Sequence, residues 1–405
     1  MFHRFLILVF TLIACFGQSL WAQVAVRGKL IYTMEGQPIE DGTIVIRDGK
    51  IAAIGKSNEM SVPNDFEIIE AAVVTPGLID AHSTVGLSGM LNQDEDQDQL
   101  EHSNPIQPAL RAFDAFNSRD ELIPWVRGFG VTTINTGHAP GELVSGQTMV
   151  VKTIEGGGKD AILVETRAVA TTLSTEAKKT GKASPGTRGK MLEMLRSKLL
   201  AAREYQQKLA KAESGSDDSE EDKKDPPSRD LELETLADVL AKKTPLLITA
   251  HRGQDITNAL RLAKEFDFKL WLDGAAEAYL LIDEIKQAQV PVLIHPSMAR
   301  AVGDRENLSF ETASKLVKAG IPVAMQSGYE AYVPKTRVVL FEAAIAAANG
   351  LTFEQTLASI TINSAKILGV ADRVGSIKIG KDGDLALNDG AYAMRRVLER
   401  VAIIK

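Results

Sequence analysis

Hydrophobic positions follow one pattern at the two ends of this chain and a different pattern in the middle. At both ends, short β-rich runs alternate with turns, and Asp48-Gly49 separates two of the runs in the manner of a tight hairpin. The ends therefore predict one small β domain to which both contribute. Its expected strands are Val24–Tyr32, Gly42–Arg47, Lys50–Ile54, Gly375–Ile379, Gly383–Leu387 and Val397–Ile403.

In the middle of the chain, short apolar runs alternate with helical patterns. Apolar residues recur three and four positions apart in Ile256–Phe266, Ala275–Gln287 and Thr312–Ala319, which predicts amphipathic helices. Such alternation is typical of a parallel barrel or of a doubly wound sheet. Eight strands are expected, at Val73–Ala81, Val131–Asn135, Thr148–Lys152, Ile162–Thr166, Leu246–Ala250, Phe268–Leu272, Val290–Ile294 and Ile321–Met325.

An insertion interrupts the pattern between the fourth and fifth of these strands. Thr187–Ala212 is charged and amphipathic and predicts a long helix. The following segment 213–228 is rich in Ser, Asp, Glu and Lys, and it has too little apolar surface to offset the entropy of ordering. We expect a disordered, solvated loop there, with partner binding as the alternative.

Net charge and the first residues narrow the class of protein. The chain carries a net charge of −7, which argues against nucleic-acid binding because that needs a basic surface. Arg4, the apolar run Phe5–Phe16 and a small residue at Ala22 predict an export signal over residues 1–22, too short in its apolar part to span a bilayer. A lipid anchor on Cys15 is the alternative. Cys15 is the single cysteine, so cleavage after Ala22 leaves no disulfide or thiolate metal site.

Two blocks of sequence resemble a known family. One is the stretch 74–82, Val74-Thr75-Pro76-Gly77-Leu78-Ile79-Asp80-Ala81-His82, and the other comprises Thr361–Gly369 and Gly375–Leu385. Both resemble the amidohydrolase superfamily, and in particular its imidazolonepropionase-like branch. The resemblance implies an α/β fold: a (β/α)₈ TIM-like barrel over residues 76–370, and a small composite β-sandwich formed by residues 24–75 and 371–405.

The resemblance also implies a metal-dependent hydrolase. In that family one or two divalent ions lie at the C-terminal mouth of the barrel and lower the pKa of a bound water. The family pattern places His-x-His after the first strand, a bridging Lys or Glu near the fourth, and single histidines after the fifth and sixth. An Asp after the eighth strand binds metal and accepts the proton of the water.

This chain keeps part of that ligand pattern. His82 matches the first histidine, but Thr84 replaces the second. His251 follows the fifth strand as expected, and Asp273 stands where the histidine of the sixth strand belongs. We therefore expect one divalent ion, zinc by preference, bound by His82, His251 and Asp273 with an open position for water. A metal-free protein is the alternative.

Other parts of the pattern are missing. Gly328 stands at the place of the strand-eight aspartate and can neither bind metal nor accept a proton. The nearest candidates for the bridging ligand are Glu165 and Lys152. His295 or His138 would then have to accept the proton in place of the aspartate.

All five histidines beyond residue 22 fall at the C-terminal ends of predicted strands or in the segments that follow, where barrel enzymes keep their chemistry. They are His82, His102, His138, His251 and His295. We expect a periplasmic or secreted hydrolase of a small-molecule carbon–nitrogen bond, either an amide or cyclic amide of non-peptide or dipeptide-like type. An inactive binding or scaffold protein of the same fold is the alternative, and either one could form oligomers.

Overall fold

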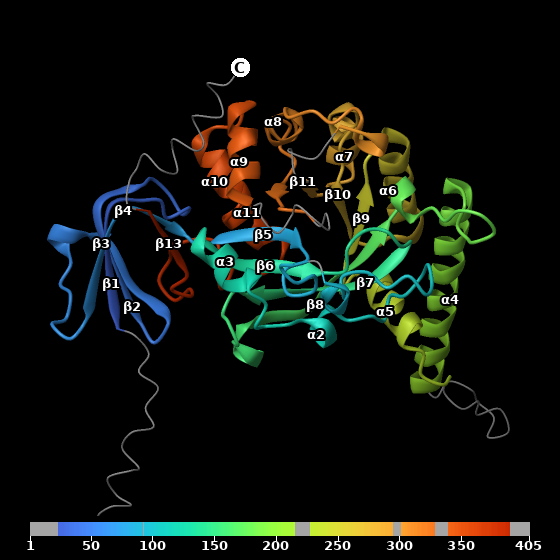
Figure 1. Cartoon of the computed structure of the whole chain (residues 1–405), viewed down its shortest axis with the longest axis horizontal. Helices are drawn as coiled ribbons and strands as arrows, with labels where there is room; N and C mark the ends of the chain where they lie inside the picture. The colour runs from blue at the N-terminus through green and yellow to red at the C-terminus, as the bar shows by residue number, and fades with distance from the viewer. Residues whose placement is uncertain (1–22, 92, 215–226, 295–300, 329–338, 389–405) are drawn as a thin grey trace, which may run out of the picture.

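A computed structural model describes residues 23–91, 93–214, 227–294, 301–328 and 339–388 of the chain, which form two sheets (Figure 1). The small sheet lies at one end of the molecule and the long helix α4 (Arg188–Ser214) at the other. The predicted export signal, the acidic stretch 215–226, His295 and the predicted strand Val397–Ile403 lie outside the described residues. No helix in the described part of the chain is long and apolar enough to cross a membrane.

The small sheet combines both ends of the chain, as the sequence predicted. Its order is β13-β4-β1-β2-β3, so the late strand β13 pairs with β4. Asp48 and Gly49, between β2 and β3, both have positive φ (51° and 71°), in line with the expected hairpin turn. The strands are β1 (Val24–Ile31), β2 (Ile39–Arg47), β3 (Lys50–Lys56), β4 (Glu67–Pro76) and β13 (Leu385–Asn388).

One predicted strand of this domain is wrong. Gly375–Ile379 is not a strand, because Gly375 has φ +86° and the segment turns instead of extending. The segment still serves the small domain, since Ile377 is buried in its core and the Ile377 amide donates to the Thr33 carbonyl at 2.8 Å.

The predicted first barrel strand, Val73–Ala81, is divided between the two sheets. The chain passes from β4 to β5 (Leu78–Ser83) at Gly77, whose amide donates to the Asp384 carbonyl of the small domain at 2.8 Å. A Cβ at Gly77 would lie 2.0 Å from Oγ1 of Thr132, so glycine is needed for this close crossing. The crossing joins the two domains tightly.

The second sheet is the predicted barrel, and its eight strands fall where the apolar runs placed them. Sheet neighbours follow chain order from β5 to β12, and a bridge between Ser83 and Gly328 joins the first strand to the segment after the last. After β5 the strands are β6 (Val131–Gly137), β7 (Val144–Lys152), β8 (Ile162–Thr172), β9 (Leu246–Ala250), β10 (Leu270–Gly274), β11 (Val292–Ile294) and β12 (Val323–Met325).

Strand β7 departs from a regular (β/α)₈ barrel. It runs antiparallel to both β6 and β8, whereas the other neighbouring pairs are parallel. The connections at 138–143 and 153–161 are too short for the crossover that a parallel pair requires. Consequently β6, β7 and β8 form a meander, and the C-terminal end of β7 lies at the opposite end of the barrel from the other C-termini.

Helices cover the outside of the barrel (Figure 1). Buried Ile256, Ala259 and Leu262 give α6 (Gly253–Phe266) the predicted apolar face. The predicted helix Ala275–Gln287 is shorter, because Ala275 adopts a left-handed conformation (φ +48°) and only its end becomes helical. The remaining helices are α2 (Ala112–Ala115), α3 (Leu122–Gly128), α5 (Leu231–Leu240), α7 (Ile282–Gln287), α8 (Thr312–Lys318), α9 (Val339–Ala348), α10 (Phe353–Ser359) and α11 (Ile362–Ile367).

A buried ionic network fastens the barrel to the small domain. Lys152, at the end of β7, lies 2.7 Å from an oxygen of Asp382 and 2.8 Å from one of Asp384. Asp382 also pairs with Arg373 and Lys50, and its side chain is only 3% exposed. Burial alone would raise the pKa of Asp382, but hydrogen bonds from these cations hold it far below its usual range. The network accounts for Asp382 and Asp384 in the Gly380–Leu385 block.

Candidate active site

The carboxylate of Asp273 is the centre of a buried polar cluster at the C-terminal mouth of the barrel. His82 Nδ1 lies 3.2 Å from Asp273 Oδ1, and Gln326 Nε2 donates to the same oxygen at 2.6 Å. The Thr249 hydroxyl donates to Oδ2 at 2.5 Å. Side chains from the ends of β5, β9, β10 and β12 thus converge on one charge, and His82, Gln326 and Asp273 are fully buried.

The contact with Asp273 fixes the tautomer of His82. A carboxylate can only accept, so Nδ1 of a neutral His82 carries the proton and Nε2 keeps the lone pair. Histidines that bind metals are commonly oriented in this way, with one ring nitrogen donating to a carboxylate. In this tautomer Nε2 is the ring nitrogen that could bind a cation.

His251 lies beside this cluster, directly after β9, and packs against Gly274. A Cβ at Gly274 would come within 2.4 Å of His251 Cε1, and Gly274 has φ +75°. The next residue, Ala275, is also left-handed at φ +48°, which is unusual for a residue with a side chain. Backbone strain of this kind concentrates at functional sites, and here it makes room for the His251 imidazole against Gly274.

Asp80 forms a second buried contact that ties the first strand to the last. It accepts from the backbone amide of Ser327 at 3.0 Å and also from the Ser327 hydroxyl. Burial raises the pKa of Asp80 to about 6, although the hydrogen bonds from Ser327 oppose this shift. The sequence reasoning did not single out Asp80, Ser327, Thr249 or Gln326. Their place in the sequence could have marked them as site residues, since each lies at or just after the C-terminal end of a predicted strand.

His138, one of the predicted catalytic residues, follows β6 on the same face. It is 4% exposed, and a Cβ at Gly146 would lie 2.3 Å from its Cδ2. Burial lowers the pKa of His138 to about 4, so this imidazole is neutral at pH 7. His295, the other predicted catalytic residue, lies outside the described residues.

The two candidates for a bridging metal ligand lie away from the site. The side chain of Glu165 is 59% exposed and pairs with Arg111 at 3.4 Å. Lys152 lies at the opposite end of the barrel because β7 is reversed, and there it binds Asp382 and Asp384. Neither residue can bridge metals at the mouth. Gly328, at the place of the strand-eight aspartate, has φ +85° and bridges to Ser83.

The fit to a divalent ion depends on the donor set and on its placement. Two imidazoles and a carboxylate suit zinc, and the contact of His82 Nδ1 with Asp273 at 3.2 Å leaves Nε2 as the ring nitrogen that would bind an ion. As the side chains stand, however, no three His, Cys, Asp or Glu residues in the described part of the chain are grouped so that they could hold a metal. The chemistry of the donors fits, while their placement requires side chains to move before an ion can bind.

The molecule has the architecture of a barrel enzyme, with polar side chains gathered at the C-terminal mouth where such enzymes keep their active sites. The model of the amidohydrolase family matches residues 193–403, more than half of the sequence. The chain belongs to the amidohydrolase family, as the resemblance of the two sequence blocks predicted.

Similar proteins agree with this assignment. The chain is 30% identical over 105 residues to an imidazolonepropionase of Syntrophobacter fumaroxidans and 32% identical over 81 residues to one of Fusobacterium nucleatum. These matches cover 26% and 20% of the chain, and only 24% and 20% of the two relatives.

Two solved structures extend the comparison to nearly the whole chain. The crystal structure of an amidohydrolase from Thermotoga maritima MSB8 is 28% identical, has a TM-score of 0.83, and covers 92% of this chain and 96% of its own. An adenosine deaminase from Xanthomonas campestris with bound zinc is 16% identical, has a TM-score of 0.53, and covers 94% of this chain and 89% of its own, which supports the fold alone.

Proposed function

We propose that this protein hydrolyses a carbon–nitrogen bond in a small molecule, either an amide or a cyclic amide of non-peptide or dipeptide-like type. The observation that carries the proposal is the convergence of His82, Thr249 and Gln326 on the buried Asp273 carboxylate at the barrel mouth. A buried charge with three directed donors is costly to maintain for stability alone. Family membership and the position of the cluster support a catalytic use.

We propose further that His82, His251 and Asp273 bind one divalent ion, zinc by preference. A bound ion of this kind supplies a water of lowered pKa. The contact of His82 Nδ1 with Asp273 makes Nε2 the lone-pair nitrogen, and Gly274, the residue after Asp273, leaves room for the His251 ring. Thr249 and Gln326 hold the carboxylate in place. Asp273 would take one of two roles. It would either keep its hydrogen bond to His82 and orient that ring, or give up this bond and bind the ion directly.

For proton transfer we propose His138 or His295, since Gly328 cannot accept a proton. His138 is neutral at pH 7 and so can accept, although a base with a pKa of about 4 holds the proton weakly. Export to the periplasm or secretion is also part of the proposal and rests on residues 1–22 of the sequence alone.

A second candidate function is binding or scaffolding without catalysis. Gly328 in place of the aspartate favours it, because glycine can neither bind metal nor accept a proton. The two functions differ in what the purified protein contains and does.

Elemental mass spectrometry and a hydrolysis assay separate the two functions. We would measure zinc, iron and manganese in the purified protein and its activity on amides, cyclic amides and dipeptides. The hydrolase requires about one metal per chain, lost in His251→Ala and retained in His102→Ala, a control whose side chain is 70% exposed. A metal-free protein that stays inactive after metal addition would establish the binding protein instead.

A further inference from the structure

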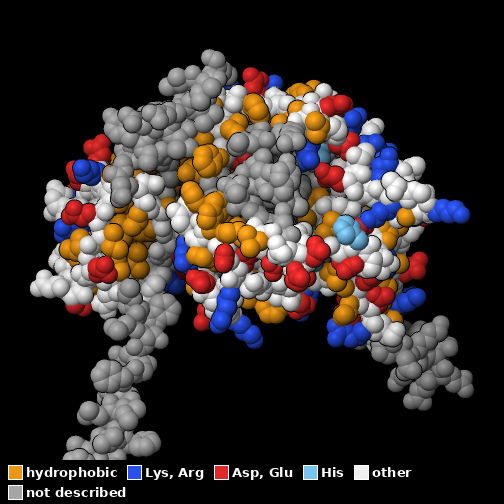
Figure 2. All heavy atoms as spheres, in the orientation of Figure 1, with side chains coloured by type: hydrophobic (Ala, Val, Ile, Leu, Met, Phe, Trp, Pro, Cys, Tyr) orange, Lys and Arg blue, Asp and Glu red, His pale blue; other side chains and the backbone are white. Residues whose placement is uncertain are grey.

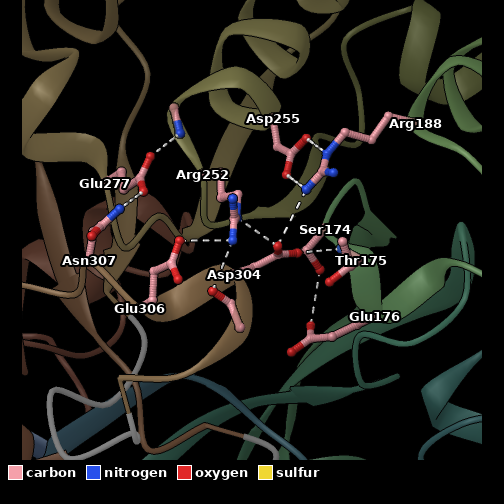
Figure 3. A network of polar contacts seen from close by, with 12 residues as sticks. Ser174, Thr175, Glu176, Arg188, Arg252, Asp255, Glu277, Asp304, Glu306 and Asn307 are labelled. Atoms are coloured by element: carbon pink, nitrogen blue, oxygen red, sulfur yellow. Dashed lines mark hydrogen bonds and ion pairs between the residues drawn. The ribbon is translucent and has the colours of Figure 1, made fainter.

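A network of charged and polar residues surrounds Arg252, the residue after His251 (Figure 3). It joins the segments that follow four successive strands, β8 to β11, although these segments lie up to 133 residues apart in sequence (174 to 307). The members labelled in the figure are Ser174, Thr175, Glu176, Arg188, Arg252, Asp255, Glu277, Asp304, Glu306 and Asn307. None of them belongs to the polar cluster around Asp273.

Arg252, the residue after His251, is held on the β11–α8 side of the network. Its Nε lies 2.9 Å from Asp304 Oδ1, and one terminal nitrogen donates to Glu306 at 3.0 Å and to the Gly303 carbonyl at 3.3 Å. A guanidinium bound at several points has little freedom to rotate. The side chain therefore fixes the backbone that immediately follows His251.

Glu277 holds the same backbone from the β10 side. The amide of Glu277 donates to the carbonyl of His251 at 2.9 Å, and its carboxylate accepts from the Gly253 amide at 2.6 Å. The other carboxylate oxygen accepts from Asn307 at 2.7 Å. His251, Arg252 and Gly253 are thus each tied to a neighbouring loop by a direct bond.

Asp304 anchors the network and is almost buried, at 8% exposure. It accepts from the Thr175 amide at 2.5 Å and pairs with Arg188 at 3.4 Å as well as with Arg252. Burial would raise the pKa of Asp304, but the hydrogen bonds from Thr175 and the charges of Arg188 and Arg252 lower it overall. Asp304 is therefore ionised at neutral pH and keeps its pairs.

We propose that Arg252, Asp304 and Glu277 are positioning residues that set the location of the His251 imidazole. The inference rests on the proposed function, in which His251 binds the ion. Gly274 accommodates the ring on one side, and the network fixes its backbone on the other. Because Gly303–Asn307 belongs to the β11–α8 segment, a displacement of that segment is transmitted directly to His251.

The test compares Arg252→Ala and Asp304→Asn with Arg196→Ala. Arg196 makes a two-point contact with Glu265 at 2.9 Å on the outer surface, so its loss costs a similar ion pair far from the mouth. The readout is the ring resonance of His251 in protein labelled with ¹³C and ¹⁵N at histidine, assigned with His251→Gln and recorded at one pH. Two variants of the network are made so that the other still tests the inference if one of them fails to fold.

The expected result is a shifted or broadened His251 resonance in both network variants and an unchanged one in Arg196→Ala. The value of kcat/KM should fall roughly 10- to 100-fold in the network variants, as for other residues that orient ligands. A His251 resonance unchanged in folded Arg252→Ala and Asp304→Asn overturns the inference. If the wild-type protein hydrolyses nothing, the proposed function fails, and the resonance still decides whether the network positions His251.

Discussion

The contact between Gly274 and His251 offers the sharpest quantitative prediction. In Gly274→Ala the new Cβ would lie 2.4 Å from Cε1 of His251, whereas ordinary contacts begin near 3.4 Å. The imidazole or the end of β10 must therefore move by about 1 Å, the difference between these two values. An alanine at φ +75° adds about 1–2 kcal/mol of backbone strain.

Gly320 supplies a matched control for the backbone part of this cost. Its φ is +82° and its added Cβ would meet nothing within 4 Å, so Gly320→Ala carries the left-handed strain without the collision. Gly320→Ala should lose about 1–2 kcal/mol of unfolding free energy in urea denaturation, and Gly274→Ala should lose about 1–3 kcal/mol more because of the collision. Only Gly274→Ala should also lose activity, by a factor on the order of 100, because a 1 Å displacement of a reacting group has that effect.

The comparison between the two variants tests whether the contact of His251 with Gly274 matters for activity. If Gly274→Ala keeps wild-type kcat/KM and zinc content, the placement of His251 against Gly274 has no functional meaning. If Gly320→Ala loses as much activity as Gly274→Ala, the loss comes from general destabilisation and not from the imidazole.

Three further predictions follow from the buried groups. Asp382→Asn should lower the unfolding free energy by about 1.5–3 kcal/mol in urea titrations, because it weakens the charge-assisted bonds from Lys152, Arg373 and Lys50 while Asp384 still pairs with Lys152. Exposed Asp267→Asn should cost less than about 1 kcal/mol, and equal losses would refute the role of the domain network. His138 has its pKa lowered from 6.5 to about 4, so the unfolded chain binds more protons between these values; stability should fall by up to about 3 kcal/mol as the pH drops from 6.5 to 4, and a His138→Gln variant with the same pH slope would contradict this. Gln326→Leu removes a 2.6 Å hydrogen bond to a buried carboxylate and should cost about 1.5–3 kcal/mol in thermal or urea unfolding; a loss near zero would refute the stabilising role of this hydrogen bond.

The sequence predicted the positions of all eight barrel strands because each is an apolar run bounded by polar segments. It could not reveal the direction of β7, since hydrophobic periodicity is the same for either direction of a strand. The length of the connection after β7 does indicate its direction. Only nine residues separate Lys152 from Ile162, and a parallel pair needs a crossover of a dozen or more.

The site was only partly visible in the sequence. Asp273 and His251 were predicted because the family pattern marks the ends of their strands, and the structure places the His251 ring against Gly274, the residue after Asp273. Gln326 and Thr249 could not be assigned, because their contact with Asp273 depends on the register and twist of three different strands. Surface charge gives no further guidance, since acidic and basic side chains are interspersed over the face in Figure 2.

Because β7 is reversed, one connection of the barrel lies far from the candidate active site. The turn between β7 and β8 lies at the end of the molecule away from the mouth, and side chains added at Gly156 or Gly158 would meet no neighbour within 4 Å. An affinity tag or fluorophore inserted there would leave the substrate entrance open. The chain could thus be immobilised on a solid support through this turn, with every molecule presenting its mouth to the solution.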